Sequence, residues 1–79
     1  MRAQLENRIR VYRAEHRLSQ SDLAEKIGVT RKTISTIEVG RYTPSTIIAL
    51  KIAGCFQVPV ENIFWLQDQD GPGQSNPKQ

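Results

Sequence analysis

The segment from Ser19 to Gly40 (SQSDLAEKIGVTRKTISTIEVG) constrains the fold more than any other part of the chain. Ser19 and Asp22 fit a capping box, in which each side chain binds an otherwise unpaired backbone N–H at a helix start. Gly28 follows where the chain must reverse, because glycine enters the left-handed region without a Cβ penalty. Thr30 offers an N-cap oxygen for a second helix, and Gly40 ends it. The segment therefore predicts two short helices across a tight turn, over about 20–27 and 31–39.

A helix is also expected before this segment. Leu5, Ile9 and Tyr12 recur at the i, i+4, i+7 spacing of a helical face, with charged residues between them. We predict a first helix from about Asn7 to His16. The residues before Asn7 stay open between frayed chain, an extension of the helix and a short strand.

Two further helices are expected after Gly40. Ser45 can cap a helix over about 46–57, and Pro59 suits the first turn of a short one from Val60 to Phe64. The longer helix has more apolar residues than one face needs. We expect its core side to be Ile47 or Ala49 with Leu50, Ala53 and Phe56. A second stripe, formed by Ile48, Ile52 and Cys55, would cover a terminal segment or meet another subunit. The tail from Gln67 to Gln79 is polar and rich in Gly and Pro, which predicts disorder.

Composition narrows the class of protein. A chain of 79 residues with 38% hydrophobic and 24% charged residues suits one small domain. The N-terminus has no signal-peptide core, and no stretch approaches the ~18 apolar residues of a membrane span, so we expect a soluble, cytoplasmic protein without membrane contact. Cys55 and His16 are the single cysteine and histidine, so neither a disulfide nor a metal site is expected. No nucleophile, base and acid set is present, so an enzyme is the least favoured class, and no cofactor is expected.

The charge is divided unevenly along the chain. From Arg8 to Arg41 there are eight basic and four acidic residues, whereas from Tyr42 to Asp70 one lysine opposes three acids. Such a division suits a polyanion on one side of the molecule and a protein contact on the other. An unevenly charged, solvated surface is the alternative.

The chain resembles the lambda-repressor-like or XRE family of helix-turn-helix DNA-binding regulators between Asn7 and about Leu66. The residues that carry the resemblance are the LSQ of Leu18 to Gln20, Leu23 and Ala24, Gly28, the TISTIE run ending at Glu38, Gly40, and the Pro44-Ser45 pair. The resemblance implies an all-α domain of five helices over residues 1–66 and double-stranded DNA as the partner.

The second helix of the pair is the expected reader of base edges. Arg31, Lys32 and Thr36 lie on its outward face near the N-terminus, and Ser35 is a weaker candidate for a base or a phosphate. A solvated helix face is the alternative for Arg31 and Lys32. By resemblance, Gln20 contacts a phosphate at the start of the preceding helix. The other expected phosphate contacts are Arg41, Tyr42, Thr43 and Arg10. For Tyr42, a ring packed across the loop is equally open.

The resemblance also implies contacts that hold the domain and its partner subunit. An ion pair is expected between Arg13 and Glu38, which would make this acidic residue structural. The small stand-alone cytolysin-repressor-type regulators are the most similar members. They imply a homodimer formed by a segment at about 58–67, with a short C-terminal strand around Phe64 to Gln67 and an N-terminal strand as its optional partner. The expected interface residues are Ile48, Ile52, Phe64, Trp65 and Leu66.

These features together predict a small dimeric transcriptional regulator, with repression of a promoter through a palindromic operator as the favoured activity. Two alternatives stay open: a DNA-binding antitoxin whose second half captures a toxin, and a protein-interaction module of the same fold. The sequence does not predict an operator sequence, a regulated gene or a small-molecule effector.

Overall fold

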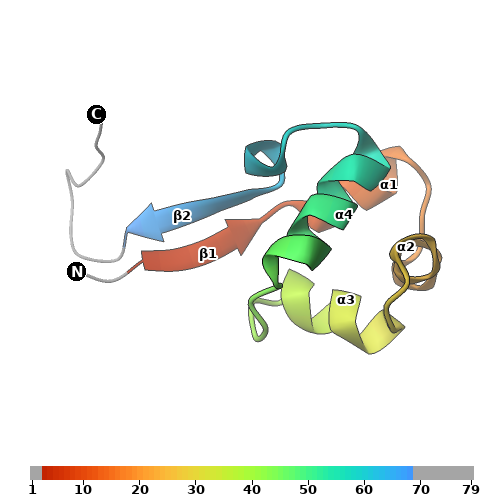
Figure 1. Ribbon diagram of the computed structural model, residues 1–79, viewed down its shortest axis with the longest axis horizontal. Helices are drawn as coiled ribbons and strands as arrows, with labels where there is room; N and C mark the ends of the chain where they lie inside the picture. The colour runs from red at the N-terminus through yellow and green to blue at the C-terminus, as the bar shows by residue number, and fades with distance from the viewer. Residues whose placement is uncertain (1–2, 69–79) are drawn as a thin grey trace.

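The computed structural model describes residues 3–68 of the chain, and in them four α-helices and a two-stranded sheet follow one another in the order shown in Figure 1. The elements are β1 (Ala3–Asn7), α1 (Ile9–Glu15), α2 (Gln20–Ile27), α3 (Arg31–Glu38), α4 (Thr46–Phe56), the 3-10 helix η1 (Val60–Asn62) and β2 (Phe64–Asp68). No helix in this range is long and apolar enough to cross a membrane.

The helix boundaries around the central segment follow from their caps. Ser19 Oγ accepts a hydrogen bond from the N–H of Asp22, and the N–H of Ser19 donates to Asp22 Oδ2, both at 2.9 Å, so the predicted capping box is formed. Hydrogen bonds from the backbone and then the side chain of Ser19 lower the pKa of the Asp22 carboxyl from its ordinary value, because they stabilise its charged form. Thr30 Oγ1 accepts from Thr33 N at 3.3 Å at the start of α3. Local sequence chemistry therefore fixes where both helices begin.

The core is built from one side of each helix and from the segment that leads into β2. Its fully buried large side chains are Ile9, Leu23, Ile34, Ile37, Ile52 and Ile63. Tyr12 and Phe56 add a tilted ring contact with centroids 5.4 Å apart. The apolar residues of α2 and α3 in this cluster are Leu23, Ala24, Ile27, Ile34 and Ile37.

The expected faces of α4 are corrected by the structure. Ile52 is fully buried with Phe56 one turn later, whereas Ile47 and Leu50 are 67% and 55% exposed. At 3.6 residues per turn the two pairs lie on opposite sides of the helix. Both sides are apolar, so the sequence pattern alone could not select the buried one. Ile52, expected at a subunit interface, belongs to the core of the domain.

The two ends of the described chain meet in a sheet. β1 pairs with β2 in antiparallel register, with Leu5 opposite Leu66, and the two strands extend together away from the helices (Figure 1). The Arg8 guanidinium covers the Trp65 ring at 4.5 Å from its centroid. The predicted first helix begins at Ile9, later than expected, since Leu5 lies in a strand.

Two expectations for the C-terminal part also change. The predicted fifth helix is a 3-10 turn of three residues, Val60–Asn62, so the fold has four α-helices and a sheet in place of five helices. The tail expected to begin at Gln67 begins later, because Gln67 and Asp68 belong to β2. The disorder expected for residues 69–79 lies outside the described residues.

Candidate nucleic-acid interface

The α2–turn–α3 unit places two helices at a fixed angle through one sharp turn. Gly28 adopts φ 78°, in the left-handed region, and Val29 N donates to Ala24 O at 2.9 Å. Leu23 and Ile27 from α2 are buried with Ile34 and Ile37 from α3. One side of α3 therefore packs in the core, and the other side faces outward.

The outward side of α3 carries all four residues expected to read bases. Arg31 and Lys32 are exposed, and Ser35 and Thr36 are half-buried. Arg31 and Ser35 are four positions apart, as are Lys32 and Thr36, so the members of each pair lie side by side on the helix surface. The structure therefore brings the four candidates onto one surface.

Gln20 links the start of α2 to this surface. Arg31 Nη1 donates to Gln20 Oε1 at 3.1 Å, and Gln20 Nε2 donates to Glu38 Oε1 at 3.1 Å. The amide is therefore oriented from both sides, with its oxygen toward Arg31. One hydrogen of its NH₂ group remains for another acceptor.

Glu38 is held inside the domain by the expected partner. Arg13 Nε donates to Glu38 Oε2 at 2.6 Å, Arg13 Nη2 donates to Glu38 Oε1 at 3.2 Å, and the Glu38 side chain is only 3% exposed. Arg13 Nη1 also donates to Leu18 O at 3.0 Å. The acidic residue at the end of α3 is thus neutralised and faces inward.

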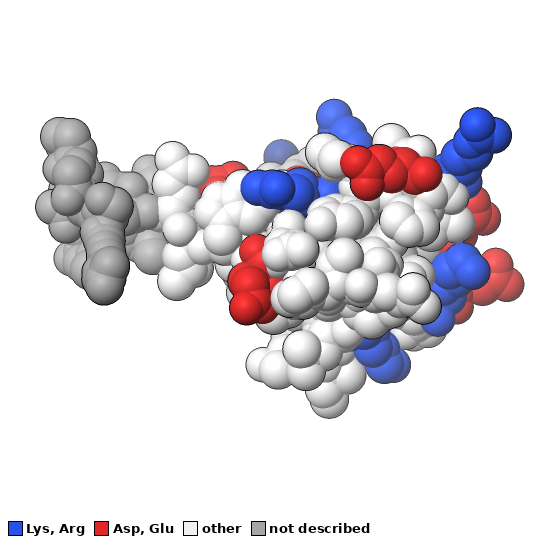
Figure 2. All heavy atoms as spheres, turned by 90° about the horizontal axis from the view of Figure 1, so that it is seen from above, with Lys and Arg blue, Asp and Glu red and all other residues white. Residues whose placement is uncertain are grey.

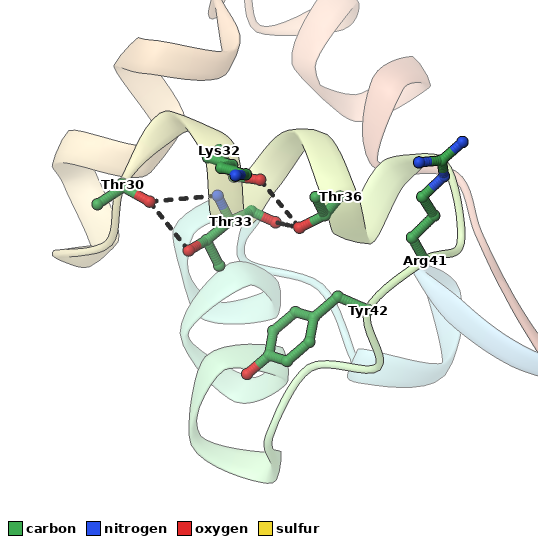
Figure 3. A pocket seen from close by; sticks show the side chains of 6 residues that line it. All are labelled: Thr30, Lys32, Thr33, Thr36, Arg41 and Tyr42. Carbon is green, nitrogen blue, oxygen red and sulfur yellow. Dashed lines mark hydrogen bonds between the residues drawn. The ribbon is translucent and has the colours of Figure 1, made fainter.

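The turn after α3 brings a second set of polar side chains beside it. Gly40 adopts φ 83°, and the N–H groups of Arg41 and Tyr42 both donate to Thr36 O, at 2.9 and 3.2 Å. Arg41, Tyr42 and Thr43 are exposed. Tyr42 is 45% exposed, and Figure 3 shows its ring below α3 at an open hollow that it lines.

The geometry agrees with three comparisons to known proteins. A family model described as helix-turn-helix matches residues 9–63. The chain belongs to the XRE-type helix-turn-helix family. An uncharacterized HTH-type transcriptional regulator of Methanocaldococcus jannaschii is 48% identical over 66 residues, which span 84% of this chain and 100% of the relative. A crystal structure of a Bacteroides fragilis protein is similar with a TM-score of 0.69 at 30% identity, over 77% of this chain and 98% of that one.

A repressor is also among the relatives. The immunity repressor protein of Bacillus phage phi105 is 38% identical over 56 residues, which span 71% of this chain and 39% of the repressor. The helix-turn-helix protein is accordingly a transcriptional regulator with a DNA-binding domain, a class that is not enzymatic. Within residues 3–68 no group of His, Cys, Asp and Glu could hold a metal ion.

Other expected site residues of the helix-turn-helix protein lie apart from α3. Arg10 is exposed on α1, and in residues 3–68 no hydrogen bond or ion pair joins it to α2 or α3. In Figure 2, basic side chains lie over the helical part of the molecule with acidic ones among them, while the sheet carries few charges.

The five residues expected at a subunit interface differ in how far they are buried. Ile52 is fully buried and Phe64 is 7% exposed, so both belong to the core, and Ile48 packs half-buried against it. Trp65 and Leu66 are 36% and 69% exposed. These two are the most exposed of the five expected residues, and the Arg8 guanidinium covers part of Trp65.

Sequence reasoning missed two residues that shape the site. Asn7 Nδ2 donates to Ile37 O at 3.1 Å, and Asn7 Oδ1 accepts from Ile9 N at 3.1 Å, so this side chain joins the start of α1 to the end of α3. An Asn before an apolar helix start was the available signal. Thr33, which was not among the expected contacts, lines the hollow beside Tyr42.

Proposed function

We propose that this regulator represses transcription by binding a palindromic operator as a homodimer. The observation that carries the proposal is the single outward surface of α3, where Arg31, Lys32, Ser35 and Thr36 face away from the core. An exposed helix with short polar and basic side chains suits the major groove, where Arg and Lys donate to guanine O6 and N7. In this arrangement Arg31 and Lys32 read bases, with Thr36 and Ser35 beside them.

Phosphate contacts on both sides of α3 would hold it in register. Gln20 lies in the first turn of α2, where free N–H groups and the helix dipole favour an anion, and its remaining amide hydrogen can bind a phosphate oxygen. Arg41, Tyr42 and Thr43 would bind the backbone after α3, and Arg10 would extend the contact from α1. The buried ion pair between Glu38 and Arg13 supports this proposal, because it keeps an acidic charge away from the surface that would approach DNA.

A second copy follows from the small size of one reading surface. One α2–α3 unit contacts few base pairs, and specific operators combine two half-sites one helical turn apart, about 34 Å. The apolar side chains exposed on α4 and β2 favour self-association: Ile47, Leu50, Trp65 and Leu66. Gly54 lies one turn beyond Leu50, and a Cβ added there would meet nothing within 4 Å in the same chain. Packing within the chain therefore does not require a glycine at this position. A second helix that approaches α4 closely here would require one.

Repression is supported by the phage immunity repressor among the relatives. A dimer seated on a promoter excludes polymerase without needing a further activating surface. DNA as the target implies a cytoplasmic location. No observation in residues 3–68 favours the antitoxin or the protein-interaction alternative.

The test is selection of bound sequences from random duplexes, followed by binding titrations of two alanine variants. Arg31→Ala and Lys32→Ala should each relax preference at particular base pairs, at a cost of ~1–3 kcal/mol. Lys26→Ala is the matched control, since Lys26 is an exposed base near Lys51 and Cys55, away from α3. A reporter promoter that overlaps the selected operator then reports the sign of regulation. If the selection enriches no sequence, the proposal of sequence-specific DNA binding is wrong. If the protein increases transcription from the reporter promoter, the proposal of repression is wrong.

A further inference from the structure

An open hollow lies on the DNA-facing side of α3 and continues onto the turn that follows. It has a volume of about 350 Å³ and is lined by Thr30, Lys32, Thr33, Thr36, Arg41 and Tyr42. Figure 3 shows Thr33 and Thr36 on one side of it and the Tyr42 ring on the other, with Arg41 directed away from the ring. The hollow is larger than one methyl group requires, so a methyl group and the base edge that carries it can both enter.

The threonine hydroxyls around the hollow are already used inside the protein. Thr36 Oγ1 donates to Lys32 O at 2.9 Å and to Thr33 O at 3.1 Å, and it has only one hydrogen to share. Thr33 Oγ1 lies 3.1 Å from Thr30 Oγ1, which also accepts from Thr33 N. Because the hydrogen of the Thr36 hydroxyl is used within its own helix, the side chain has no donor left for a base edge, and its methyl group is available for an apolar contact.

The charges at the hollow suit an apolar group attached to a polyanion. Lys32 and Arg41 contribute two positive charges, and no acidic residue is among the lining side chains. The apolar surface comes from the threonine methyl groups and the Tyr42 ring. Tyr42 is 45% exposed. Among the base edges in the major groove, thymine presents a C5-methyl group, and threonine methyls pack against it.

We propose that this hollow receives the C5-methyl group of a thymine, so that Thr36, with Thr33 and Tyr42, specifies an A·T pair in each half-site. The inference rests on the proposed function, in which α3 enters the major groove. Thr36 then reads DNA by an apolar contact and not by a hydrogen bond, while Arg31 and Lys32 supply the hydrogen bonds at neighbouring pairs.

The test replaces each thymine of the selected operator by deoxyuridine, which removes the methyl group and leaves base pairing unchanged. At one thymine in each half-site, the replacement should weaken binding about fourfold. This factor corresponds to the free energy gained when one carbon group is buried. Thr36→Ser keeps the hydroxyl and removes the methyl. It should weaken binding about fourfold to the thymine duplex and bind the deoxyuridine duplex no worse than the unaltered protein does.

Thr36→Val is the complementary variant, because it keeps an apolar branch and removes the hydroxyl. It should retain the preference for thymine over deoxyuridine, and thermal unfolding shows that each variant is folded. The inference is overturned if every deoxyuridine duplex binds like the parent, or if Thr36→Val loses the preference while Thr36→Ser keeps it. Either result leaves the proposed function standing, provided that the selection enriches a sequence; a selection that enriches none overturns both.

Discussion

Arg13 and Glu38 are joined by a 2.6 Å bond between Nε and Oε2, which ties α1 to the last residue of α3. The two side chains are 15% and 3% exposed, and the same carboxylate also accepts from Gln20 at 3.1 Å. The buried Glu38 carboxylate thus links α1, α2 and α3. The arrangement of α2 and α3 is therefore held in part by a charge that is buried inside the domain.

Glu38→Ala should lower the free energy of unfolding by ~3–5 kcal/mol, because it leaves the Arg13 guanidinium largely buried without its anion. Chemical denaturation at neutral pH measures the change. Glu25→Ala is the matched control, since Glu25 is exposed on α2 and forms no ion pair in residues 3–68. A denaturation midpoint for Glu38→Ala equal to that of the control would show that the pair adds nothing to stability.

The capping box predicts a dependence of stability on acidity. The bonds from Ser19 lower the pKa of Asp22 below its ordinary 3.8 in the folded protein. A depressed pKa stabilises the folded state fully above the ordinary value, and this contribution disappears as the pH falls through the lower, folded value. The difference in unfolding free energy between the unaltered protein and Asp22→Asn should therefore be constant near neutral pH and shrink below about 3.8. A difference that stays constant throughout would contradict the assignment.

The two apolar sides of α4 should respond differently to substitution. Ile52→Ala removes a fully buried side chain and should cost ~2–5 kcal/mol of stability. Leu50→Glu changes a side chain that is 55% exposed, so it should leave the fold of the monomer intact and weaken self-association. Sedimentation equilibrium over a range of protein concentrations measures the second effect. If Leu50→Glu associates as the unaltered chain does, the dimer contact lies elsewhere.

The parts of the fold that sequence predicts well are those specified by local chemistry. Ser19, Gly28 and Thr30 fix helix ends through contacts within a few residues, so α2 and the start of α3 were predictable. The C-terminal strand implied by the resemblance is present as β2, but its pairing with an N-terminal strand was only an option, because β1 and β2 pair residues about sixty positions apart and no local pattern encodes that pairing. The buried side of α4 was predicted only in part: Ala53 and Phe56 are buried as expected, but Leu50 is exposed and Ile52 is buried in its place. Both sides of the helix are apolar, and only packing against the other helices distinguishes them.

The contact between Gln20 and Arg31 makes one further prediction about how the site reads DNA. Gln20→Ala removes a phosphate donor and should weaken binding to all duplexes by about tenfold or more, the value of a hydrogen bond to a charged group. It also removes the 3.1 Å acceptor that holds Arg31, so preference at the base pair read by Arg31 should relax as well. Arg10→Ala is the contrast: within residues 3–68 Arg10 forms no hydrogen bond or ion pair with α2 or α3, so its loss should weaken binding without changing preference. Binding titrations against the selected operator and its single-base variants separate the two effects. An unchanged preference in Gln20→Ala would mean that Arg31 reaches its base without help from α2.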